Sequence, residues 1–205
     1  MTTPYDFDAL EKTNKFSKAF KIGSGDITWL DFIEAVSKKK KPIILSTGAS
    51  DIKDVTNAVK VINKFNNKIC VMQCNTNYKN ERKNFNHINL RVLNLYKKKF
   101  KNIILGLSDH TEGHSTVLGA VTLGARIIEK HFTDDNKRNG PDHYFSMNPN
   151  SWKEMIKRTR ELEDALGYEK KIIEQNEQES ALVQRRCIRL NRNLIKGSII
   201  SIKYL

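Results

Sequence analysis

The sequence predicts an α/β fold built on a parallel sheet. Short apolar runs alternate with helical patterns of apolar residues, five times along the chain. The runs are almost continuously apolar, which is typical of strands buried on both faces. Polar side chains gather where each run ends. Parallel strands share that carboxyl edge, where α/β proteins place their functional sites.

The expected elements follow from these runs and from the residues that end them. Strands are predicted at 19–24, 42–47, 69–75, 102–109 and 125–132. Helices are predicted at about 6–16, 29–40, 51–66, 86–99, 114–124 and 150–166. Ser50-Asp51 and Asn150-Ser151 are plausible N-caps, and Gly124 and Gly167 stand where helices should stop.

Both ends of the chain suggest further structure beside the alternating strands and helices. Residues 2–10 have the pattern of a loop that follows a strand and leads into a helix, so we expect a strand before them. After Gly167 a charged linker is predicted over 168–180. Residues 181–190 and 193–200 then predict two strands of a small β module.

Length and composition predict one cytoplasmic domain, or one domain plus a stub. The chain has 205 residues, 39% of them hydrophobic, and no apolar run of membrane-spanning length. The first residues lack the basic and apolar regions of a signal peptide. Three cysteines, Cys70, Cys74 and Cys187, are an odd number and suggest reduced thiols. The two on the third strand are expected to pack.

The chain is strongly basic, with a net charge of +13 and a pI near 9.6. Such a charge permits nucleic-acid binding. The lysine runs 38–41 and 97–99, however, fall at predicted helix C-termini, where cations complement the helix dipole. They are not interleaved with aromatic residues. We therefore expect no nucleic-acid partner and no membrane partner, and a surface that favours an anionic substrate.

Two histidines end consecutive predicted strands. Because side chains alternate along a strand, Ser108 and His110 share one face, and Glu129 and His131 share one face of the next. Neighbouring strands lie about 4.8 Å apart, so one divalent metal could bridge both rings. Water or substrate would complete the shell, as in a catalytic site. The alternative is that each histidine is a hydrogen-bonded structural residue.

Nine motifs in order resemble the sialic acid synthase family, the N-acetylneuraminate synthases and their legionaminic and pseudaminic relatives. The resemblance covers essentially the whole chain. The motifs begin at Thr2 (TTPYD), Lys21 (KIGSGD), Pro42 (PIILSTG), Gln73 (QC, with NY at 77–78), Gly106 (GLSDHT), Leu118 (LGAVTLGA), Glu129 (EKHFT), Gly140 (GPD) and Ser146 (SMNP).

The resemblance implies a TIM (β/α)8 barrel followed by a small antifreeze-like (SAF) domain. On that template residues 1–167 are a partial barrel with its last five strands, 168–180 a linker and 181–205 the truncated start of the SAF domain. The chain then resembles a fragment of a full-length parent that forms homodimers. It is expected to be inactive and poorly stable alone, since an open barrel leaves unpaired strand edges.

The resemblance also implies a reaction. The family condenses phosphoenolpyruvate with an open-chain N-acylhexosamine such as N-acetylmannosamine, and releases phosphate by C–O cleavage. A divalent metal, Mn or Mg, polarises the sugar aldehyde. By resemblance, His110 and His131 bind this metal.

The other site residues are carried over by matching motifs. Lys21 and Ser24 would hold phosphoenolpyruvate, with Ser46 and Ser108 nearby. Thr76 and Tyr78 would touch the sugar or phosphoenolpyruvate. The catalytic candidates are Glu129, Asp142 and Lys21. A Gly-Ser-Gly loop suits phosphate, because backbone N–H groups can approach it closely. Lys79 departs from the proline usual in relatives, which leaves the loop 79–86 uncertain.

Other interpretations stay open. Lys21 could instead be the nucleophile of a metal-free Schiff-base aldolase on the same barrel. The chain could also be a non-catalytic remnant that binds a ligand or partner. Three of the site residues also have purely structural interpretations. Lys21 could be a surface lysine at the end of a strand, Asp142 a turn residue, and Glu129 a hydrogen-bond partner that orients His131.

Overall fold

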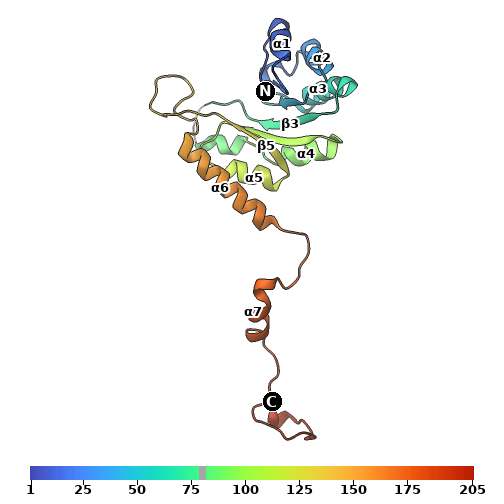
Figure 1. The fold of residues 1–205 in the computed structure, drawn as a ribbon, viewed down its shortest axis with the longest axis vertical. Helices are drawn as coiled ribbons and strands as arrows, with labels where there is room; N and C mark the ends of the chain where they lie inside the picture. Colours follow the sequence, from blue (N-terminus) through green and yellow to red (C-terminus); the bar gives the residue numbers. More distant parts are fainter. Residues whose placement is uncertain (79–81) are drawn as a thin grey trace. The chain divides into compact units, whose positions relative to one another are not determined.

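The structure is a computed structural model that describes residues 1–78 and 82–205. Within those residues five strands form one sheet in chain order, β1-β2-β3-β4-β5 (Figure 1). Every neighbouring pair is parallel, which confirms the predicted parallel α/β sheet. Each strand lies inside its predicted range: β1 Phe20–Ile22, β2 Ile43–Ser46, β3 Ile69–Cys74, β4 Ile104–Asp109 and β5 Ala125–Lys130.

Helices connect the strands, as the alternating pattern predicted. They are α1 Phe7–Asn14, α2 Leu30–Lys38, α3 Ile52–Phe65, α4 Val92–Lys99, α5 Ser115–Thr122 and α6 Pro149–Leu166. Short 3-10 segments at Ser24–Asp26 and Arg82–His87 follow β1 and precede α4. None of the helices in the described part of the chain is long and apolar enough to cross a membrane.

Helix ends confirm one predicted cap and correct two other boundaries. Asp51 caps α3, with its carboxylate accepting from the N–H groups of Lys53 and Asp54. The cap of α6 is Asn148 and not Asn150-Ser151, because Pro149 occupies the first helical position, where its missing N–H costs nothing. Helix α4 begins later than predicted, because the 3-10 segment extends to His87 and Asn89 then has a positive φ of 51°, which an α-helix does not accommodate.

Buried side chains separate the two faces of the sheet. The larger cluster joins one face of all five strands to residues of α1 through α6. The smaller cluster contains Ile44, Cys70 and Met72, with Ile127 packed against it, and all four lie on strands. The helices therefore cover one face of the sheet. The opposite face, called the inner face below, carries the small cluster and, at its carboxyl end, the polar side chains.

A bulge interrupts the pairing of β4 with β5 on this inner face. Leu105 pairs with Ala125, but Gly106 pairs with Ile127, so one residue of β5 is skipped. The strands approach closely there: a Cβ at Gly106 would lie 2.8 Å from Met72 Cγ and 2.9 Å from the backbone oxygen of Ile127. Only glycine fits this position without movement of β5.

Replacing Gly106 with alanine should therefore destabilise the fold by roughly 1–3 kcal/mol, the usual cost of overpacking a core. The side chain of Met72 can rotate, but a backbone oxygen cannot move without its strand. Urea unfolding followed by circular dichroism measures the loss. Gly25→Ala is the matched control, since a Cβ there meets no atom within 4 Å. Equal midpoints for the two variants would contradict the prediction.

Residues Met1–Gly167 and Tyr168–Leu205 form separate compact units. In the second unit the strands predicted at 181–190 and 193–200 are wrong. Gln178–Val183 form a short helix, α7, and the described residues after it contain a 3-10 turn at Ile202–Tyr204 and no strand. A strand needs a neighbour for its backbone groups, and these largely exposed residues find none in their own unit.

Candidate active site

A cavity of about 550 Å³ opens on the inner face, at the carboxyl ends of the strands. All ten site residues named from the sequence line it: Lys21, Ser24, Ser46, Thr76, Tyr78, Ser108, His110, Glu129, His131 and Asp142. They come from β1, β2, β4 and β5 and from the loops that follow the strands. The convergence follows from the parallel sheet, because its strands end along one edge.

The cavity wall at β1, β4 and β5 carries a charged cluster. Lys21 Nζ lies 3.1 Å from Glu129 Oε1, and the lysine side chain is only 13% exposed. The hydroxyl of Ser108 donates to the same carboxylate oxygen at 2.9 Å. Lys21 is thus not a free strand-end surface lysine. One oxygen of Glu129 therefore contacts both groups in the cavity wall.

Hydroxyl groups line the wall at β1 and β2. Ser24 Oγ accepts from the backbone N–H of Gly48 at 2.9 Å, which ties the loop after β1 to the loop after β2. Ser46 is 1% exposed, and within the described residues its hydroxyl has no hydrogen-bond partner. A buried hydroxyl without a partner is costly. In a cavity wall, such a group indicates a position where a ligand atom would complete its bonding.

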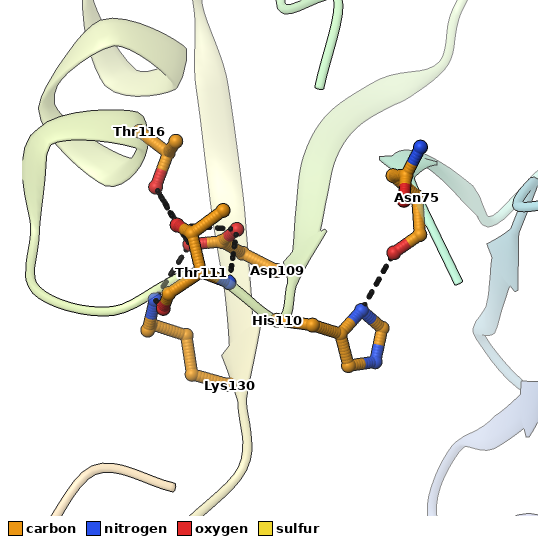
Figure 2. A network of polar contacts seen from close by, with 6 residues as sticks. All are labelled: Asn75, Asp109, His110, Thr111, Thr116 and Lys130. Atoms are coloured by element: carbon orange, nitrogen blue, oxygen red, sulfur yellow. Dashed lines mark hydrogen bonds and ion pairs between the residues drawn. The ribbon is translucent and has the colours of Figure 1, made fainter. Parts of the chain in front are cut away.

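The two histidine rings lie next to each other in the cavity wall, with ring centroids 5.1 Å apart. His110 Nδ1 lies 2.8 Å from the backbone oxygen of Asn75 (Figure 2). A carbonyl oxygen can only accept, so Nδ1 carries the hydrogen and Nε2 of the neutral ring keeps a lone pair. Burial lowers the pKa of His110, which favours that neutral ring.

His131 has a longer polar contact on its own side. Its Nδ1 lies 3.5 Å from Asp142 Oδ2, so this carboxylate is placed to orient the ring. The ring of Tyr78 packs edge-on to His110 at 4.5 Å and to His131 at 5.7 Å. In the part of the chain that the structure describes, no three His, Cys, Asp or Glu side chains converge as a complete ligand set.

The pair nonetheless fits a divalent metal. Two imidazoles with lone pairs available, each steadied through its other nitrogen, are common metal donors, and the cavity leaves room for oxygen ligands. Other histidines lie elsewhere: His143 Nδ1 is 2.7 Å from Thr133 Oγ1, and His114 precedes α5. Lys79, the departure noted in the sequence, lies outside the described residues.

Sequence reasoning left out three residues that line the cavity: Tyr5, Asp26 and Cys74. Tyr5 and Asp26 stand inside quoted motifs, so their proximity to the site could have been inferred. Cys74 was expected only to pack, yet the period of two places it on the same face as Cys70, at the carboxyl end of the strand. Its position next to the cavity follows from that face.

Thiol labelling should separate the cysteines. Burial, followed by the charge of Glu129, raises the pKa of the Cys70 thiol to about 12, and burial also raises the pKa of Cys74. Both are therefore neutral, poorly nucleophilic thiols at pH 8, whereas Cys187 is exposed. We expect iodoacetamide to label Cys187 first, as mapped by peptide mass spectrometry. Labelling of Cys74 as fast as Cys187 would contradict this.

Comparison with known proteins adds to the geometry. Residues 1–171 match the NeuB family. An N,N'-diacetyllegionaminic acid synthase of Campylobacter jejuni is 36% identical over 205 residues, which cover 98% of this chain and 60% of that enzyme. An uncharacterized protein of Methanocaldococcus jannaschii is 40% identical over 204 residues, covering 98% and 59%. The chain thus spans about three fifths of the length of these relatives.

Solved structures agree with this match. The N-acetylneuraminic acid synthetase of Leptospira borgpetersenii superposes with a TM-score of 0.78 at 28% identity, over 90% of this chain and 65% of that one. Several of the relatives are named as synthases of sialic-type acids, and the match to their family covers most of the chain in an unbroken range. The chain belongs to the NeuB family, the family of the sialic acid synthases.

Proposed function

We propose that this protein is a nonulosonic (sialic-type) acid synthase that condenses phosphoenolpyruvate with an open-chain N-acylhexosamine and releases phosphate. The observation that carries the proposal is the cavity itself. It brings a lysine, three serine hydroxyls, three carboxylates and an adjacent pair of histidines to one edge of the sheet. Those groups suit an anionic substrate at one end and a metal-bound carbonyl at the other.

The anion end of the cavity lies at β1 and β2. Lys21 supplies a positive charge, and the hydroxyls of Ser24, Ser46 and Ser108 supply neutral hydrogen bonds. The unpartnered Ser46 hydroxyl would donate to a phosphate or carboxylate oxygen of phosphoenolpyruvate, which removes its burial cost. Thr76 lies in the same wall and would contact either substrate.

The metal end lies at β4 and β5. His110 and His131 would hold Mn²⁺ or Mg²⁺ through Nε2, with Asn75 and Asp142 orienting the rings from behind. When bound, the ion would polarise the aldehyde of the sugar. Tyr78 packs against both rings and limits the space beside them, so its edge would contact the bound sugar.

Glu129 and Asp142 have different roles in this proposal. One oxygen of Glu129 contacts both Lys21 and Ser108, and the residue lines the cavity. It would take or give a proton at the sugar as the new bond forms. Asp142 is more exposed and stands beside His131, where positioning that ring is its main role.

The proposal also covers the barrel, the second domain, the oligomeric state and the cellular location. Strands in chain order with helices on one face favour a wall of a (β/α)8 barrel over a doubly wound sheet, which carries helices on both faces. The SAF domain from residue 181, a homodimer and a cytoplasmic location are inferred from the resemblance and from the reduced thiols.

Calorimetry with phosphoenolpyruvate and Mn²⁺ tests the proposal, together with phosphate release after an N-acylmannosamine is added. We expect phosphoenolpyruvate to bind the wild-type chain and to bind Lys21→Gln at least tenfold more weakly, since a charge-assisted contact is lost. Lys12→Gln, at an exposed lysine paired with Asp8, is the control. Borohydride trapping of a substrate on Lys21 without metal would replace this proposal with the Schiff-base aldolase.

A further inference from the structure

A buried ion pair lies directly behind the two histidines. Lys130 Nζ lies 2.6 Å from Asp109 Oδ2, and the two side chains are 2% and 0% exposed. Asp109 precedes His110 and Lys130 precedes His131, so alternation points the ion pair to the helix-covered face and the histidines to the inner face. Figure 2 shows His110 directed away from the pair.

The pair also holds the turn that follows His110. Asp109 Oδ1 accepts from the backbone N–H of Thr111 at 3.1 Å and from its hydroxyl at 2.9 Å, while the hydroxyl of Thr116 in α5 donates to Oδ2 at 2.6 Å (Figure 2). Lys130 Nζ donates to the backbone oxygen of Thr111 at 2.6 Å. The backbone N–H and C=O of Thr111 are therefore both hydrogen-bonded, in the residue that follows the candidate metal ligand His110.

The Asp109–Lys130 ion pair bears on the register between β4 and β5. After the bulge, Ser108 pairs with Glu129 and Asp109 with Lys130, which places His110 beside His131. Without the skipped residue, Asp109 would stand opposite Glu129, and every side chain at the end of β5 would change face. Two buried carboxylates would then meet, and Lys130 would enter the cavity. The ion pair therefore favours the observed register over this alternative.

We propose that Asp109 and Lys130 are positioning residues that hold β4 and β5 in the register that brings the imidazoles of His110 and His131 together. A buried ion pair adds little net stability over a well-packed apolar pair, because both charges lose water. Its measurable contribution here is the alignment of β4 with β5, and with it the distance between the two imidazole rings. The metal readout of this inference rests on the proposed function, whereas the distance between the two rings does not.

The test is the double variant Asp109→Leu/Lys130→Met, studied in the full chain. Its urea midpoint should lie well above that of Asp109→Leu alone and close to that of the wild type, since neither charge is left buried alone. The NOE between the ring protons of His110 and His131 should be lost or weakened. The affinity for Mn²⁺, measured by calorimetry, should fall by about tenfold or more, the usual effect of removing support behind a ligand.

The control is Asp134→Asn/Arg138→Gln, which removes an exposed ion pair of 2.8 Å shortly after His131. It should leave the midpoint, the NOE and the Mn²⁺ affinity unchanged. Thr111→Val gives a second, milder variant that keeps the ion pair and the shape of the side chain. It should weaken the NOE and the affinity in the same direction but to a smaller extent.

The outcomes separate this inference from the proposed function. A wild-type chain that shows the ring NOE but binds no Mn²⁺ would contradict the metal site, and the NOE of the double variant would still test positioning. A folded double variant with an unchanged NOE would overturn the inference. If that variant does not fold, an unchanged NOE in Thr111→Val overturns it equally.

Discussion

Replacing His131 with alanine should remove divalent-metal binding, and in the full-length parent turnover as well, while leaving the fold intact. Losing the support behind a metal ligand costs roughly 10–100-fold in affinity, so losing one of two protein ligands costs more than about 100-fold. The side chain is 30% exposed, and it packs mainly against rings that line the cavity, so little core is lost. Calorimetry with Mn²⁺ measures the affinity, and urea unfolding checks the fold.

His114→Ala is the matched control for this variant. His114 stands four residues after His110, does not line the cavity, and makes no side-chain cap to α5. Its replacement should leave Mn²⁺ binding unchanged. Metal binding that survives in His131→Ala, or activity that persists in the wild type after treatment with EDTA, would count against both the metal site and the mechanism.

Replacing Asp109 alone with leucine should be among the most destabilising single changes in this chain. It leaves the ammonium of Lys130 buried without a counter-ion and removes the acceptor for Thr111 and Thr116. Breaking a buried pair in this way costs about 3–5 kcal/mol. That is a large part of the total stability of an ordinary domain, about 5–15 kcal/mol. The shift of the urea transition measures it.

Asp134→Leu provides the comparison, because Asp134 also pairs with a cation but both side chains are exposed. Its urea midpoint should stay within error of the wild type, since exposed pairs contribute little. The double variant Asp109→Leu/Lys130→Met should recover most of the loss. Similar midpoints for Asp109→Leu and Asp134→Leu would show that the buried pair is not a strong determinant of stability.

The sequence was sufficient to predict ten of the residues that line the cavity, because strand ends locate some of them and the resemblance locates the others. Apolar runs located the strands, and a period of two placed Ser108 with His110 and Glu129 with His131. In a parallel sheet all carboxyl ends meet at one edge, so residues distant in the sequence converge without further information. The predicted strands after Gly167 failed because a strand also needs a partner, and periodicity cannot supply one.

By itself, then, the sequence determined the alternation of strands and helices, the face on which each polar side chain lies, and the family. Only the tertiary structure decided the pairings: Lys21 with Glu129, Asn75 behind His110, and the skipped residue that sets Asp109 opposite Lys130. The physical reason is that alternation is a local property of the backbone. Register and ion pairing depend instead on how separate segments meet, and that is settled by packing and charge across the sheet.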